Sequence, residues 1–162
     1  MDALDLATPQ ATRRLGLRLG QVLEVGDFVA LVGDLGAGKT LFVRGVAEGA
    51  GVPESERATS PTFALVNVYR GGRVPLQHLD LYRLGGGADL FALGFDDLLR
   101  EPAATLVEWA DRAAGALPDD RLELKLVVTG PRSRRLELNA SGPRGERLRA
   151  ILLKPSRRRP QS

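Results

Sequence analysis

Residues 33–40 read GDLGAGKT and directly follow the apolar run FVALV, a pairing that constrains the fold more than any other stretch. The spacing is G-x-x-x-x-G-K-T, in which glycines let the backbone curl until successive N–H groups point at one anion. A helix is expected from residue 38, so its N-terminus would face the same anion. At this spacing Lys39 reaches the β- and γ-phosphates of a nucleotide, and the Thr40 hydroxyl can ligate Mg²⁺. The sequence therefore predicts a phosphate-binding loop rather than a plain glycine turn.

The rest of the chain alternates between helical and strand-like patterns. Helical patterns occupy residues 8–23, 38–51, 87–101, 110–118 and 145–153. Strand-like patterns occupy residues 27–33, 60–70, 73–84, 104–109, 121–128 and 134–140. Two hairpins are expected, one turning at Gly71 and Gly72 and the other at residues 129–133. The predicted fold class is α/β: a single P-loop NTPase-like domain, residues 1–153, with a mixed central β-sheet flanked by helices.

The composition restricts the compartment in which this domain is expected to work. The 162 residues include no cysteine, which excludes disulfides and thiolate metal sites. No apolar run approaches the length of about 20 residues that spans a membrane, and the acidic start MDALDLATPQ does not resemble a secretory signal. A cytoplasmic protein is therefore expected. The net charge is +3, and residues 154–162 are expected to form a basic, disordered tail. Its arginines leave contact with RNA open, because guanidinium groups fit phosphate.

A phosphate-binding loop needs a second acidic residue for the metal, at the end of a neighbouring strand. Two candidates follow strand-like runs: Asp80 ends VPLQHLD, and Glu108 ends TLVE. Trp109 comes next and could pack in the core or line a nucleotide pocket. His78 lies on the same strand face as Asp80, two residues earlier, and is interpreted as structural. Residues 59–63, TSPTF, could be a switch segment that senses the γ-phosphate or a plain turn.

The order of these pieces resembles a known family. Four motifs follow one another in the order and at the spacing typical of the bacterial TsaE (YjeE) family of small P-loop ATPases, which this chain resembles. They are GDLGAGKT, SPTF, HLDLYRL and LVEW. The resemblance covers about residues 8 to 128. It implies a part in forming N6-threonylcarbamoyladenosine at position 37 of tRNAs that read ANN codons. Members bind ATP, assemble with the TsaD–TsaB pair, and hydrolyse ATP to allow repeated turnover.

The resemblance also implies a role for individual residues. Residues 35–40 would hold the phosphates, and Thr40 and Glu108 would hold Mg²⁺. Asp80 would serve catalysis by positioning water or supporting the metal, and Glu108 and Lys39 would be catalytic as well. Pro9 and Thr12 would lie near the adenine, although Thr8-Pro9-Gln10 replaces the acid that the family usually has there. The residues that would contact the nucleotide are, in full, Leu35, Gly36, Ala37, Gly38, Lys39, Thr40, Thr62, Trp109, Pro9 and Thr12.

Other classes of P-loop protein fit parts of the sequence. A small-molecule P-loop kinase would need an arginine lid, for which Arg132, Arg134 and Arg135 are candidates, but they flank a hairpin turn and are interpreted as solvated. A GTPase would need an N/T-K-x-D motif, and none of the three lysines, Lys39, Lys125 and Lys154, stands in one. A binding module without catalysis would have no need for both acids. The sequence therefore favours a Mg²⁺-dependent ATPase.

Overall fold

Seven strands form one mixed sheet in the computed structural model, which describes residues 2–57, 66–82, 84, 87–113 and 115–155. Their order across the sheet is β1-β7-β6-β2-β5-β4-β3. The central strands β6, β2, β5 and β4 run parallel, while β7 pairs antiparallel with β6 and β1, and β3 pairs antiparallel with β4. The strands are β1 (Asp2–Leu6), β2 (Phe28–Val32), β3 (Val66–Tyr69), β4 (Leu76–Asp80), β5 (Ala104–Glu108), β6 (Arg121–Val128) and β7 (Arg134–Ser141).

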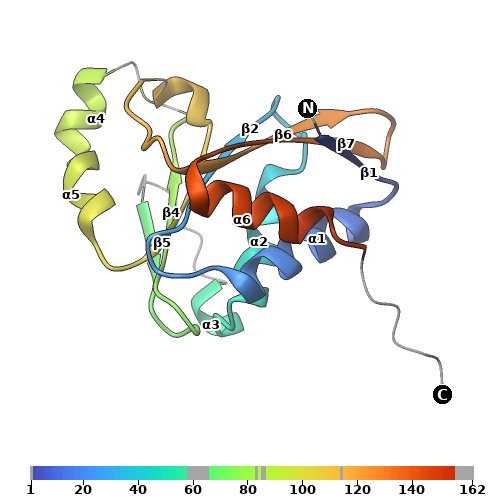
Figure 1. The fold of residues 1–162 in the computed structure, drawn as a ribbon, viewed down its shortest axis with the longest axis horizontal. Coiled ribbons are helices and arrows are strands. Elements are labelled where there is room, and N and C mark those ends of the chain that lie inside the picture. Colours follow the sequence, from blue (N-terminus) through green and yellow to red (C-terminus); the bar gives the residue numbers. More distant parts are fainter. Residues whose placement is uncertain (1, 58–65, 83, 85–86, 114, 156–162) are drawn as a thin grey trace.

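Helices cover both faces of this sheet, and α1, α2 and α6 lie together on one side (Figure 1). The other side carries a smaller apolar cluster with residues from α4, α5 and η1. The helices are α1 (Pro9–Val22), α2 (Lys39–Gly49), α3 (Glu54–Arg57), α4 (Gly87–Leu93), α5 (Phe95–Arg100), the 3₁₀ helix η1 (Ala110–Ala113) and α6 (Gly142–Leu153). The α/β class with a mixed sheet flanked by helices is therefore confirmed.

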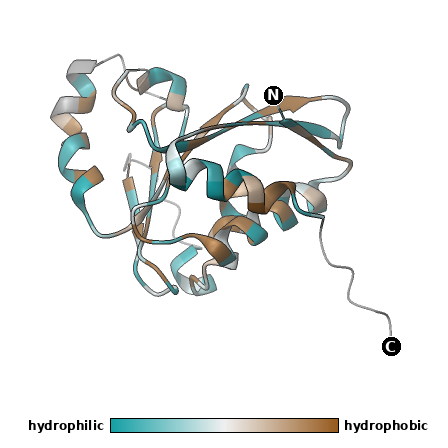
Figure 2. Cartoon of the chain, viewed as in Figure 1, coloured by the Kyte–Doolittle hydropathy of each residue, from teal (hydrophilic) through white to brown (hydrophobic). Residues whose placement is uncertain are grey.

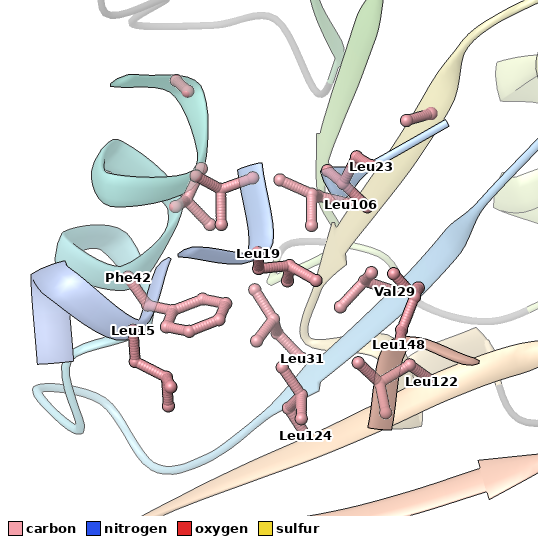
Figure 3. Close-up of a cluster of buried hydrophobic side chains, with 14 of the residues drawn as sticks. Leu15, Leu19, Leu23, Val29, Leu31, Phe42, Leu106, Leu122, Leu124 and Leu148 are labelled. Carbon is pink, nitrogen blue, oxygen red and sulfur yellow. The ribbon is translucent and has the colours of Figure 1, made fainter. Parts of the chain in front are cut away.

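The buried strand β2 supplies side chains to both layers. Val29 and Leu31 belong to the larger cluster, whereas Phe28 and Ala30 belong to the smaller one. This alternation follows from the two-residue period of a strand and explains why the run is apolar throughout. In Figure 3, Phe42 of α2 points into the space between α1 and β2, beside Leu31. The strand that leads into the glycine-rich loop is thus held on both faces.

The first helix begins where its sequence predicts. The Thr8 hydroxyl accepts a hydrogen bond from the amide of Ala11 at 3.1 Å, and Pro9 occupies the first helical position. A threonine cap satisfies one of the amides that have no partner inside the helix, and proline has no amide to satisfy. These two residues fix the start of α1 beside the glycine-rich loop.

Glycines let α1 and α2 approach each other closely. A Cβ at Gly16 would collide with the carbonyl oxygen of Phe42, and one at Gly20 with that of Val46. The relation is reciprocal, since Gly45 and Gly49 of α2 meet backbone carbonyls of α1 in the same way. Because only hydrogen occupies these positions, the two helices pack backbone against backbone.

The last helix attaches to the sheet through charge as well as apolar contact. It turns from mostly hydrophilic at its start to mostly hydrophobic at its end (Figure 2), and Leu148 and Leu152 are buried. At its start, Arg144 and Arg147 both contact the carboxylate of Asp27, whose side chain is fully buried. Asp27 immediately precedes β2, so α6 is tied to the entrance of that strand.

Two elements differ from the sequence analysis. No strand was expected at residues 2–6, but β1 pairs with β7 along its whole length. Its pattern DALDL is short, and only the neighbouring β7 gives it a place in the sheet. The helix expected over residues 110–118 is a 3₁₀ helix of four residues. The basic tail beyond residue 155 lies outside the described residues. Among those that are described, no helix is long and apolar enough to cross a membrane.

We expect Gly16→Ala to destabilise the protein by about 2 kcal/mol, in the range of overpacked cores. An alanine inside a helix normally stabilises by about 0.5–1 kcal/mol relative to glycine, so the close approach to Phe42 reverses the usual sign. Urea unfolding of the variant and wild type measures this difference. Gln21→Ala on the exposed side of α1 is the control and should be near neutral. A Gly16→Ala protein as stable as wild type would contradict the backbone contact.

Candidate functional site

The glycine-rich loop runs from the end of β2 to the start of α2, and three of its residues, Gly33, Gly36 and Gly38, have positive φ. Gly38 caps α2 with φ at 99°, in the left-handed region that side chains disfavour. At Gly33 a Cβ would lie 2.7 Å from the carbonyl oxygen of Leu126 on β6. Between them, the amide of Ala37 donates to the carbonyl oxygen of Asp34 at 3.0 Å and closes a turn. The backbone conformation therefore favours glycine at both Gly33 and Gly38, and the close contact with the sheet also requires it at Gly33.

Lys39 is folded over this loop and is 5% exposed. Its ammonium donates to the carbonyl oxygens of Gly33 and Asp34, the second at 3.0 Å. The same nitrogen lies 4.0 Å from the centroid of the Trp109 ring, a cation–π distance. Burial lowers the pKa of Lys39, while the nearby carboxylates of Glu108 and Asp80 act in the opposite direction. The site therefore holds a poorly hydrated cation next to the loop, which an anion could approach.

Glu108 lies at the end of β5 and is 4% exposed. One carboxylate oxygen lies 2.6 Å from Nε2 of His78 on β4, and the other accepts a long hydrogen bond of 3.5 Å from the Thr40 hydroxyl. The Thr40 contact is at the limit of a hydrogen bond and holds little by itself. His78, interpreted as structural from the sequence, therefore contacts an acid of the site and fixes its orientation.

Asp80 and Glu108 are neighbours in the sheet. They stand opposite each other in the parallel register of β4 and β5, at the carboxyl ends of both strands. Asp80 is exposed, and its carboxylate accepts a hydrogen bond from the amide of Tyr82 at 3.0 Å. This edge of an α/β sheet is where ligands commonly bind.

Trp109 follows Glu108 with a backbone that is rare for an aromatic residue, because its φ is +57°. The carbonyl oxygen of Trp109 accepts from the amide of Arg112 at 3.0 Å, which begins η1. The ring stacks at a tilt on Tyr82, with centroids 4.9 Å apart. One part of the side chain packs on the smaller apolar cluster, and another borders the cavity described next. The side chain therefore packs on the core, as one of the two sequence interpretations had it, and borders the cavity as well.

A cavity of about 390 Å³ brings most of the candidate residues together. Loop residues supply one side, while Asp80, Glu108 and Trp109 supply the other. Arg44 and Tyr82 also line it, and the sequence analysis did not single them out. Arg44 lies one helical turn beyond Thr40 on α2, so helical spacing was a signal that could have found it. The lining residues from the loop and the start of α2 are Leu35, Gly36, Ala37, Gly38, Lys39, Thr40 and Leu41.

Two other candidates, Pro9 and Thr12, are not among the residues that line the cavity. Both belong to the first turn of α1, and a Cβ at Gly38 would lie 3.8 Å from a methyl carbon of Thr12. Thr12 is buried, and within the described part of the chain its hydroxyl has no hydrogen-bond partner. Thr62, with the whole segment 59–63, lies outside the described residues.

The arginines of the second hairpin are not alike. Arg132 and Arg135 are exposed, as expected for a turn. Arg134 is half-buried and donates hydrogen bonds to backbone carbonyls of the glycine-rich loop. The interpretation of all three as solvated was therefore wrong for Arg134, because the hairpin folds back against the loop.

The fold and the loop together define a P-loop NTPase-like α/β domain. The chain belongs to the TsaE family, since the model described as "Threonylcarbamoyl adenosine biosynthesis protein TsaE" matches residues 6–136. The resemblance drawn from the four sequence motifs is thereby confirmed.

Individual relatives agree with this assignment. The chain is 40% identical over 127 residues to the tRNA threonylcarbamoyladenosine biosynthesis protein TsaE of Treponema pallidum, covering 78% of this chain and 92% of the relative. It is 36% identical over 140 residues to the protein of that name from Bacillus subtilis, covering 86% of each. The crystal structure of YdiB from Bacillus subtilis matches with a TM-score of 0.78 and 32% identity, over 93% of both chains.

The contact between Lys39 and Trp109 can be tested by fluorescence, because Trp109 is the only tryptophan. We expect Lys39→Met to change the emission maximum or intensity, since a charge beside the indole is removed while the length of the side chain is kept. Lys125→Met makes the same chemical change at an exposed position on β6 and should leave the spectrum as in wild type. Identical spectra for the two variants would show that the lysine and the ring are apart.

Proposed function

We propose that this chain is the ATP-binding and ATP-hydrolysing component of the machinery that forms N6-threonylcarbamoyladenosine at position 37 of ANN-decoding tRNAs. The names of the family and of its relatives support the pathway. In this proposal the chain works in the cytoplasm on TsaD- and TsaB-like proteins and permits their repeated turnover. Contact with the tRNA, direct or through these partners, belongs to the same proposal.

The observation that carries the proposal is the convergence of four side chains on one cavity. Lys39 and Thr40 come from the start of α2, whereas Asp80 and Glu108 come from the ends of two parallel strands. A triphosphate in this cavity would meet the amides of the loop and the N-terminus of α2, both of which favour anions. Lys39 would exchange its carbonyl partners for phosphate oxygens, because a charged partner binds an ammonium more strongly than a neutral one.

The residues present fit Mg²⁺. Within the described residues no cluster of three or more His, Cys, Asp or Glu side chains is arranged for a metal. Mg²⁺ does not need one, since it keeps several waters and takes one or two protein oxygens together with substrate phosphates. The Thr40 hydroxyl and the Glu108 carboxylate, 3.5 Å apart, offer such oxygens. Bound there, Mg²⁺ would neutralise charge that develops on the phosphates.

Asp80 is suited to a different part of the reaction. It lines the cavity and is exposed, so its carboxylate could accept a hydrogen bond from an attacking water. Orienting that water accelerates hydrolysis without tightening nucleotide binding. The amide of Tyr82 holds this carboxylate through one of its two oxygens.

A small-molecule P-loop kinase is the alternative that the sequence left open. It would need an arginine lid over the phosphates. The half-buried arginine of the candidate hairpin, Arg134, instead donates to backbone carbonyls behind the loop. The contacts of this arginine give the kinase no support, so the ATPase is preferred.

Nucleotide binding should depend on Lys39 and on Mg²⁺. We expect Lys39→Ala to abolish ATP binding measured by calorimetry, because the phosphates lose their main counter-charge. Glu108→Gln should bind as wild type does without Mg²⁺ but lose the added affinity that Mg²⁺ gives. Lys125→Ala and Glu101→Gln change exposed residues and serve as controls. Equal affinity of the wild type with and without Mg²⁺ would refute the metal assignment of Thr40 and Glu108.

Asp80 should separate binding from turnover. Asp80→Asn keeps the shape of the side chain, so nucleotide affinity should change little while ATP hydrolysis falls by about tenfold or more. Turnover is measured with TsaD- and TsaB-like partners present, and repeated rounds of tRNA modification should fail. Asp96→Asn, on α5, is the matched control. Normal hydrolysis by Asp80→Asn within the complex would make Asp80 structural and move attention to Glu108.

A further inference from the structure

Arg134 is held firmly by the sheet. It is the first residue of β7 and stands opposite Val128 of β6 on one side and Leu6 of β1 on the other. The turn before it is closed by a hydrogen bond from the amide of Thr129 to the carbonyl oxygen of Ser133, at 3.2 Å. The backbone that carries the guanidinium is therefore fixed from both sides before any side-chain contact is counted.

The guanidinium of Arg134 joins this hairpin to the glycine-rich loop. Nη1 donates to the carbonyl oxygens of Gly130 and Ser133, at 3.0 and 2.8 Å, within the hairpin. Nε donates to the carbonyl oxygen of Ala37 at 3.0 Å, and Nη2 donates to that of Gly36 at 3.2 Å. Arginine presents its N–H groups in a rigid planar fork, which lysine cannot reproduce. One side chain thus fixes the relative position of two segments almost 100 residues apart.

The two carbonyl oxygens of the loop that Arg134 binds each share a peptide plane with the amide of the following residue. A trans peptide unit is planar and its C=O and N–H groups point in opposite directions. Holding the carbonyl of Ala37 towards Arg134 therefore turns the amide of Gly38 away from Arg134. Gly38 lines the cavity, whereas Arg134 is not among the residues that line it. The arginine can orient a phosphate-binding amide without touching the ligand itself.

We infer that Arg134 is a positioning residue that pre-orders the loop around Gly36 and Ala37, so that the Gly38 amide is ready to receive a phosphate. This inference rests on the proposed nucleotide binding for its purpose, although the clamp itself can be tested without nucleotide. Its positive charge behind the loop adds to the attraction for an anion. The region that carries Arg134 lies beyond the four motifs that revealed the family.

Hydrogen exchange followed by mass spectrometry tests the clamp on the nucleotide-free chain. The reporter is the peptide covering residues 33–41, which includes the Ala37 amide bonded to Asp34. Arg134→Gln should speed exchange there by about tenfold, the effect of losing hydrogen bonds to a charged group, and leave the core strands unchanged. Arg135→Gln, next along the same strand and exposed, removes the same charge and should behave as wild type. Unchanged exchange in Arg134→Gln would overturn the inference.

Arg134→Lys separates geometry from charge. It keeps the positive charge but loses the fork, so fast exchange in the loop should persist and the Kd for ADP should rise about tenfold. Wild-type exchange and affinity in Arg134→Lys would overturn the clamp in favour of charge alone. If Arg134→Gln unfolds, exchange rises throughout the chain and Arg134→Lys decides the question. A wild type that binds no ADP would refute the proposed function, while the exchange data would still decide the clamp.

Discussion

The close contact of α1 with α2 is the constraint on which the site depends. Glycines on both helices let backbone meet backbone, so neither helix can shift without a collision or a gap. A close-packed interior has no space to absorb small movements, so the position of α1 determines the position of α2. Since α2 begins at Lys39, the contact also fixes where the lysine and the following hydroxyl start. It places Thr12 of α1 beside Gly38 of the loop as well.

The ionisable side chains of the site have polar or aromatic partners at short range. Lys39 lies under carbonyl oxygens and a tryptophan ring, and Glu108 lies against His78. Burial disfavours the charged form of the lysine, which its lowered pKa records. A buried charged group lowers the stability of the fold unless its partners compensate for the lost water. Groups with perturbed pKa values of this kind cluster at functional sites. The strained backbone of Trp109 belongs to the same pattern, because it turns the indole over the lysine.

The C-terminal third of the chain has a supporting role that the motifs do not reveal. Through β7 it reaches the loop with Arg134, and through α6 it reaches the start of β2 at Asp27. The buried carboxylate of Asp27 also accepts the amide of Glu24 at 2.7 Å, so its charge is well satisfied. Two parts of the segment formed by β2, the loop and α2, namely the start of β2 at Asp27 and the loop itself, are therefore held by residues that follow the four motifs in the sequence.

The sequence by itself determined the parts that depend on local pattern. The glycine-rich loop, the buried strand before it, the capped start of α1, both hairpins and the α/β class follow from spacing and periodicity, which neighbouring residues set. Strand β1, the 3₁₀ form of η1, the contact of His78 with Glu108 and the reach of Arg134 were decided by the tertiary structure alone. Three of these depend on a partner distant in the chain: β1 needs β7, His78 needs Glu108, and Arg134 needs the loop almost 100 residues earlier. A local pattern can specify a helix or a loop, but only the folded sheet can bring Asp80 and Glu108 to one edge, because their strands become neighbours only when it forms.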